Sequence, residues 1–174
     1  HLSLRRQRQM CIRDSLSTMA KDVSKLLIKR GETVAVSESS SGGLIAAALL
    51  AVPGASRYFM GGGVVYTTAA REVLLNIRLE NYPGMRSSSE PYAELAAATV
   101  RSRLGTDWGL AETGAAGPSG NRYGDAAGHT CIAISGKQDH VSTIETRSDN
   151  REENMWQFAN ETLKLFEKIL SEAK

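Results

Sequence analysis

The chain has 174 residues, of which 41% are hydrophobic and 23% charged, a composition typical of one globular domain. No apolar run is long enough to cross a membrane, and a formal net charge of +2 favours neither nucleic acid nor a membrane surface as a partner. Two widely spaced cysteines exclude a disulfide framework and a zinc site, and with no secretory signal in the first residues they predict a cytoplasmic protein.

The segment His1–Ser15 stands apart from the rest of the sequence. It carries four arginines and one aspartate, whereas the remaining residues have a formal net charge of −1. It shows neither helical nor strand periodicity and resembles the translation of a sequencing adapter fused to a gene. We therefore expect residues 1–15 to be a non-native or disordered tail, residues 16–174 to form the domain, and the native start to lie near Met19. The alternative is a basic arm that binds nucleic acid.

In chain order, apolar periodicity and glycine or proline stops predict the following elements. A helix over 17–30 is followed by a strand over 33–36, a helix over 41–52, strands over 58–59 and 64–67 on either side of three glycines, and a helix over 68–76. A loop over 77–86 leads to a helix over 89–104, a strand over 106–113, a glycine-rich loop over 114–127, a hairpin of strands over 128–135 and 140–146, and a helix over 149–174. This order predicts an α/β fold, a single-domain α/β/α sandwich with a mixed sheet.

Two segments rich in hydroxyls and glycine follow predicted strands, namely SESSSGG at 37–43 and ETGAAGPSG at 112–120. Ligands of open α/β sheets bind at such strand ends, and a helix N-terminus offers free backbone N–H groups there. The first segment lacks the lysine of a P-loop, and the second lacks the spacing of a dinucleotide-binding motif. Neither standard nucleotide motif therefore applies.

The serine run at the first of these turns has two interpretations. Ser39 can project into a cleft as a nucleophile, with the amides of Gly42 and Gly43 forming an oxyanion hole. Alternatively, residues 39–41 only cap the following helix, because serine is among the preferred N-cap residues. The residues alone leave both open.

Four segments in this order resemble the CinA C-terminal domain family, whose characterised members are nicotinamide-nucleotide amidohydrolases. They are SESSSGG at 37–43, GVVYTTAAR at 63–71, SSEP at 88–91 and TGAAGPSGN at 113–121. The resemblance covers the chain from about Met19 to its end. It implies a CinA C-terminal-like fold and hydrolysis of the carboxamide of nicotinamide mononucleotide to the acid and ammonia, without metal or cofactor.

The resemblance also implies the site residues. Ser39 would be the nucleophile, and Tyr66 and Arg71 would complete the catalytic group. Substrate-binding residues are expected at Glu38, Ser41, Gly42, Gly43, Thr113, Gly114, Gly117 and Arg122. The expected partner is a small nucleotide substrate bound by a homo-oligomer, with no nucleic acid and no membrane.

The sequence departs from the family at the group that assists the serine. Arg71 stands where the family has a lysine, and arginine stays protonated and cannot accept a proton. His129 could serve as the base but is more simply a polar strand residue bonded to backbone, while Tyr66 and Tyr123 could relay a proton only with lowered pKa values. A member that binds a nucleotide or sugar phosphate without hydrolysis is therefore the alternative function.

Overall fold

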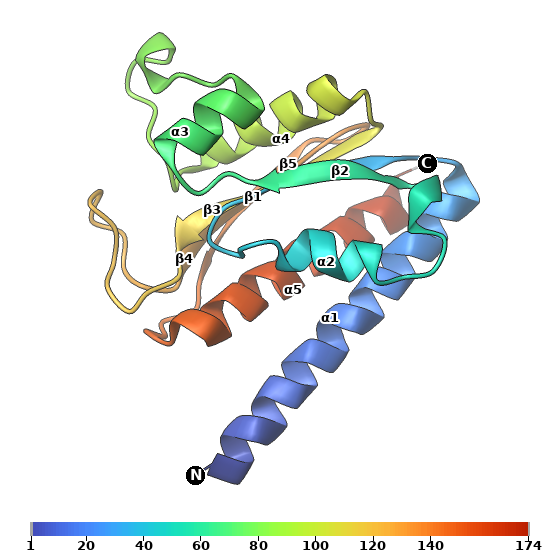
Figure 1. Cartoon of the computed structure of the whole chain (residues 1–174), viewed down its shortest axis with the longest axis horizontal. Coiled ribbons are helices and arrows are strands. Elements are labelled where there is room, and N and C mark those ends of the chain that lie inside the picture. Colours follow the sequence, from blue (N-terminus) through green and yellow to red (C-terminus); the bar gives the residue numbers. More distant parts are fainter. Residues whose placement is uncertain (1, 174) are drawn as a thin grey trace.

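A five-stranded sheet lies between two layers of helices (Figure 1). The computed structural model describes residues 2–173, except the side chains of residues 2, 3, 5, 6, 8, 9 and 12. The strands are β1 (Val34–Glu38), β2 (Phe59–Val64), β3 (Trp108–Ala115), β4 (His129–Ser135) and β5 (His140–Glu145), in the spatial order β2-β1-β3-β4-β5. Strands β2, β1 and β3 are parallel, and β4 and β5 follow as an antiparallel hairpin. The α/β sandwich with a mixed sheet is thus confirmed.

The helices divide between the two faces of this sheet (Figure 1). One layer holds α1 (Leu2–Arg30), α2 (Leu44–Leu50) and α5 (Arg151–Glu172). The other holds α3 (Thr68–Ala70), the π-helical turn η2 (Arg71–Leu75) and α4 (Glu90–Leu104). Short 3-10 turns occur at η1 (Ala55–Arg57) and η3 (Leu79–Asn81). None of the helices in the described part is long and apolar enough to cross a membrane.

Successive side chains along the strands point to opposite faces of the sheet, and the two resulting cores differ in the size of their side chains. Val36 and Leu110 belong to the core beneath α1, α2 and α5, whereas Ala35 and Ala111 belong to the core beneath α4. The alanines on that second face let α4 approach the sheet closely. A Cβ on Gly109 would lie 2.1 Å from a backbone oxygen of α4, so only glycine fits there.

Strand β2 differs from the prediction of two short strands separated by glycines. It is a single strand that runs through all three glycines and ends at Val64. A Cβ on Gly62 would lie 2.3 Å from the carbonyl oxygen of Val36 in the neighbouring strand, so the glycines allow close pairing instead of breaking the strand. The helix predicted over 68–76 is likewise broken, because η2 interrupts it with a π-helical turn.

Helix α1 begins at Leu2, not at residue 17 as predicted. The side chains described between residues 4 and 15 are all exposed, and Leu16 is the first buried residue among the described side chains of the helix. The first turns of α1 point away from the sheet (Figure 1). The helix thus extends through residues 2–15, where we expected a non-native or disordered tail, and the described side chains of this extension contribute little burial.

Deletion of residues 1–15 should leave the melting temperature within a few degrees of that of the full chain. The described side-chain contacts between this segment and other elements are those of Arg13, whose guanidinium lies 4.9 Å from the Trp156 ring centroid and 3.8 Å from Glu152. At exposed sites each is worth about 1 kcal/mol or less, or a few degrees in a domain of this size. Thermal unfolding of both chains tests this, and a loss of more than about 10 °C would show that the segment belongs to the folded domain.

Candidate active site

A polar cavity of about 280 Å³ lies at the carboxyl edge of the parallel strands. Its walls come from the segments that follow β1 and β2, from the end of β3, and from the loops before α4 and after β3. The lining residues are Ser39, Val65, Tyr66, Thr67, Thr68, Arg71, Ser87, Ser88, Tyr92, Thr113, Gly114, Arg122 and Tyr123. This is the position at which open α/β sheets bind ligands.

The cavity brings together six of the residues expected from the sequence, namely Ser39, Tyr66, Arg71, Thr113, Gly114 and Arg122. Sequence reasoning missed the contribution of Ser87, Ser88 and Tyr92. The serine run before α4 could have signalled a binding site, but the sequence indicated only a helix cap. Ser89 is indeed the N-cap, and its hydroxyl accepts a hydrogen bond from the amide of Tyr92. Only the fold shows that Ser88, just before this cap, lies against Thr113 at the end of β3 and lines the cavity.

The turn between β1 and α2 is capped by a carboxylate and not by serine. Glu38 accepts hydrogen bonds from the amides of Ile45 and Ala46, both at 2.9 Å. The residue at the N-cap position is Gly43, which makes no side-chain cap. The interpretation of residues 39–41 as helix caps is therefore wrong. Glu38 is 1% exposed and lies behind the turn instead of in the cavity.

Glu112 holds the serine turn from the neighbouring strand. Its carboxylate accepts hydrogen bonds from the amides of Ser39 (3.1 Å) and Ser41 (2.8 Å). It also accepts from the hydroxyls of Ser40, Ser41 and Thr130. With five donors directed at one buried carboxylate, Glu112 fixes the backbone from which the Ser39 side chain projects.

The two carboxylates meet at Ser41. Its hydroxyl lies 2.8 Å from Glu38 and 2.8 Å from Glu112, deep beneath the cavity. Burial raises the pKa of Glu38, and the hydrogen bonds that it accepts only partly offset this rise.

The backbone N–H groups at the start of α2 already have acceptors within the chain. The amide of Gly42 also donates within the chain, to the carbonyl of Ser39 at 3.1 Å. Ser41, Gly42 and Gly43 lie outside the cavity lining.

Arg71 lines the cavity and carries an N–H group without a hydrogen-bond acceptor among the described residues. The residue is 7% exposed, and its Nη1 donates to the hydroxyl of Ser87 at 3.1 Å. Its guanidinium carbon lies 5.9 Å from the ring centroid of Tyr92. Its Nε is buried without a hydrogen-bond partner among the described residues. A buried N–H without a partner is costly, which favours a ligand acceptor at this position.

The rim of the cavity is tied to the start of α5. Arg151 donates to the hydroxyl of Tyr66 at 3.1 Å and to the carbonyl of Gly117 at 2.6 Å. Gly117, expected in the binding site, therefore does not line the cavity, and its carbonyl accepts a hydrogen bond from Arg151 at the rim. Thr113 accepts a hydrogen bond from the amide of Ser88 at 3.1 Å, which leaves the Thr113 hydroxyl hydrogen free to donate elsewhere.

His129 is engaged on both ring nitrogens. Its Nε2 lies 3.0 Å from the carbonyl oxygen of Ser88, and its Nδ1 lies 2.5 Å from a carboxylate oxygen of Glu145. The interpretation of His129 as a polar strand residue bonded to backbone is confirmed. Because both nitrogens face acceptors and the ring lies outside the cavity lining, His129 has no free site to receive a proton from Ser39.

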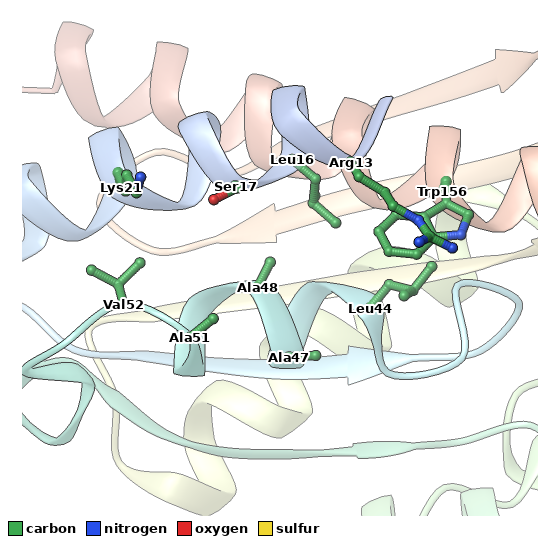
Figure 2. A pocket seen from close by; sticks show the side chains of 10 residues that line it. All are labelled: Arg13, Leu16, Ser17, Lys21, Leu44, Ala47, Ala48, Ala51, Val52 and Trp156. Atoms are coloured by element: carbon green, nitrogen blue, oxygen red, sulfur yellow. The ribbon is translucent and has the colours of Figure 1, made fainter. Parts of the chain in front are cut away.

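A second cavity, of about 260 Å³, lies on the opposite face between α1, α2 and α5. Figure 2 shows Trp156 and Arg13 at one end, Lys21 toward the other, and the small side chains of α2 between them. Its walls are mostly aliphatic and aromatic, and the polar residues that line it, Arg13, Ser17 and Lys21, are all exposed. Within the described residues there is also no cluster of metal-ligating side chains. The cavity at Ser39 is therefore the candidate active site.

Comparison with known proteins gives one consistent family. Residues 16–170 match the model described as CinA C-terminal domain. CinA-like proteins of Trichodesmium erythraeum and Synechocystis sp. are 37% and 39% identical over 139 residues, and each alignment covers 80% of this chain and 33% of the relative. The chain thus spans about a third of the length of these curated relatives.

The fold of this chain matches solved structures over nearly their full length. A competence-damaged protein (CinA) superfamily protein from Enterobacter cloacae is 26% identical with a TM-score of 0.83, and the match covers 89% of this chain and 92% of that one. The competence damage-inducible protein A of Klebsiella pneumoniae is 24% identical with a TM-score of 0.85, covering 91% and 99%.

Proposed function

This chain belongs to the CinA C-terminal domain family, and on that premise we propose that it is a serine amidohydrolase. Its substrate would be nicotinamide mononucleotide or a related nucleotide carboxamide, and its products the acid and ammonia. One observation carries the proposal. The hydroxyls of Ser40 and Ser41 both bond to Glu112, whereas Ser39 lines the cavity from a backbone that the same carboxylate holds.

The residues of the cavity support acyl transfer. Ser39 Oγ would add to the carboxamide carbon, ammonia would leave, and water would open the acyl-enzyme. With the amide of Gly42 occupied, donors for the oxyanion are the Thr113 hydroxyl and the unpaired Nε of Arg71. Arg122 adds positive charge at the same cavity, suited to the substrate phosphate.

The test is release of ammonia from nicotinamide mononucleotide by the full chain. Ammonia above the no-enzyme rate supports the proposal, and none contradicts it. The buried, unpaired Nε of Arg71 favours a second candidate in that case, a non-hydrolytic protein that binds a nucleotide or sugar phosphate. Calorimetric titration with nicotinamide mononucleotide would then show binding without turnover.

Replacing Arg71 with lysine should raise the rate of ammonia release at pH 7. The native guanidinium cannot take a proton, whereas a lysine amine in this buried position has its pKa lowered by desolvation and can act as a base. General-base assistance is worth about 10²–10⁴-fold. Initial rates of both chains across pH measure the effect. A native chain faster than the Arg71→Lys variant would show that Arg71 acts as a donor, to the oxyanion or to the substrate phosphate, and that a lysine at this position does not serve as the base.

We further propose that the chain acts in the cytoplasm as a homo-oligomer. Strand β2 is at the edge of the described sheet, and Met60 and Val64 on it are 42% and 44% exposed. Apolar side chains on an unpaired edge favour association. Light scattering would report a mass above the 18.8 kDa of one chain, and a monomer at micromolar concentration would contradict the proposal.

A further inference from the structure

The amidohydrolase proposed above needs a group that removes the proton of Ser39. Arg71 stays protonated, and both nitrogens of His129 are engaged. Among the described residues that line the cavity, the tyrosines are then the remaining side chains able to accept a proton. We propose that Tyr123 is the general base for Ser39 in this chain, an inference that rests on the serine hydrolase activity assigned to the same cavity.

Arginines surround the Tyr123 phenol. Arg122 Nη2 donates to its oxygen at 2.9 Å. The guanidinium carbons of Arg122 and Arg86 lie 5.1 and 5.2 Å from its ring centroid. Arg71 acts through Ser87, because Arg71 donates to the Ser87 hydroxyl at 3.1 Å and that hydroxyl is hydrogen-bonded to Tyr123. The hydrogen bonds and the charges of Arg122 and Arg71 stabilise a phenolate more than a phenol.

Tyr123 and Tyr92, the two more buried tyrosines of the cavity, differ in the direction in which their surroundings shift the phenol pKa. Partial burial would raise the pKa of Tyr123, but the hydrogen bonds and charges around it outweigh burial and bring the pKa below its ordinary value. Tyr92, on α4, is more deeply buried, and desolvation keeps the pKa of Tyr92 above its ordinary value. Tyr92 therefore stays protonated under conditions in which Tyr123 ionises.

The one carboxylate of this loop is held by other partners. Asp125 accepts two hydrogen bonds from Arg86, at 2.6 and 3.0 Å, and one from the side chain of Asn121 at 2.8 Å. Arg86 lowers the pKa of Asp125, so the pair is neutral overall near Tyr123. Asn121 also accepts from the amide of Tyr123 at 3.0 Å, which fixes the loop that carries the phenol.

The proton balance of the reaction is complete with this base. The phenolate takes the Ser39 proton directly or through one water, and Ser39 Oγ bonds to the carboxamide carbon. Tyr123 then returns the proton to the leaving nitrogen as the carbon–nitrogen bond breaks, and ammonia departs. In the second half, water gives a proton to the phenolate and attacks the ester, and Tyr123 returns that proton to Ser39. Because only the phenolate accepts a proton, the rate should rise with pH through the pKa of Tyr123.

The test measures activation of Ser39 without relying on the nucleotide substrate. A fluorophosphonate probe bonds to an activated serine oxygen with loss of fluoride, and peptide mass spectrometry locates the adduct. The full chain should be labelled at Ser39 at a rate that rises with pH. The Tyr123→Phe variant should be labelled more slowly by a factor of about 10² or more, and its labelling rate should no longer rise with pH. Tyr82→Phe, which removes a phenol hydroxyl outside the cavity, is the matched control and should behave as the native chain.

A second variant keeps the phenol and changes only its environment. Arg122→Met removes the hydrogen bond to Tyr123 from an exposed residue, and should move the rise in labelling to higher pH. Equal labelling of the native chain and Tyr123→Phe, an unmoved profile in Arg122→Met, or no labelling of native Ser39 would each overturn the inference. Labelling that depends on Tyr123, without ammonia from nicotinamide mononucleotide, would retain Tyr123 as base and reject that substrate.

Discussion

Replacing Glu112 with alanine is expected to lower the free energy of unfolding by about 3–5 kcal/mol. The change leaves the amides of Ser39 and Ser41 and the hydroxyls of Ser40 and Thr130 without their acceptor, at a site where Glu112 is only 2% exposed. The Ser41 hydroxyl keeps Glu38 as an acceptor. Each buried donor left unpaired costs about 1–3 kcal/mol, although the hydroxyls can partly recover by rotating. Urea unfolding of the native and variant chains measures the loss.

Glu112→Gln is the matched control for this prediction. The amide oxygen of glutamine can still accept from the amides of Ser39 and Ser41, while its NH₂ faces the hydroxyls of Ser40 and Thr130, which can rotate to accept. We expect this variant to lose about 1–2 kcal/mol, clearly less than alanine. If both substitutions cost less than about 1 kcal/mol, Glu112 does not hold the serine turn.

Ser39→Ala is expected to reduce ammonia release from nicotinamide mononucleotide by at least about 10³-fold, as loss of the nucleophile does in serine hydrolases. The fold should be unaffected, because the substitution keeps the Cβ atom and the residue 39 amide that donates to Glu112. A coupled assay for ammonia gives the rate, and thermal unfolding verifies that the variant is folded.

The control for the nucleophile is Ser102→Ala, an exposed serine on α4 outside the cavity, which should retain the native rate. If Ser39→Ala hydrolyses the substrate as fast as the native chain, Ser39 is only part of the turn and the acyl-enzyme mechanism is wrong. A variant that binds the nucleotide normally but releases no ammonia would place the loss in the chemical step.

The sequence by itself determined the elements whose signals are local. The helix from Ser89 to the Gly105 stop, the hairpin of β4 and β5, and the long C-terminal helix all follow from caps, turns and periodicity within one segment. The same local reading failed at β2, because glycine usually marks a break. Here the close approach of Val36 to Gly62 decides in favour of a strand, and that contact belongs to a different element.

The candidate site divides in the same way. Ser39, Tyr66 and Thr113 could be expected at the cavity because strand ends and family motifs mark them in the sequence. The roles of Glu38 and Glu112 were decided only by the tertiary structure. Glu112 lies 73 residues from Ser39 in the chain, and parallel pairing of β1 with β3 brings its carboxylate to the serine amides. A hydrogen bond between distant segments leaves no periodicity in either one, so the acceptor that holds the serine turn can be recognised only once the sheet has formed.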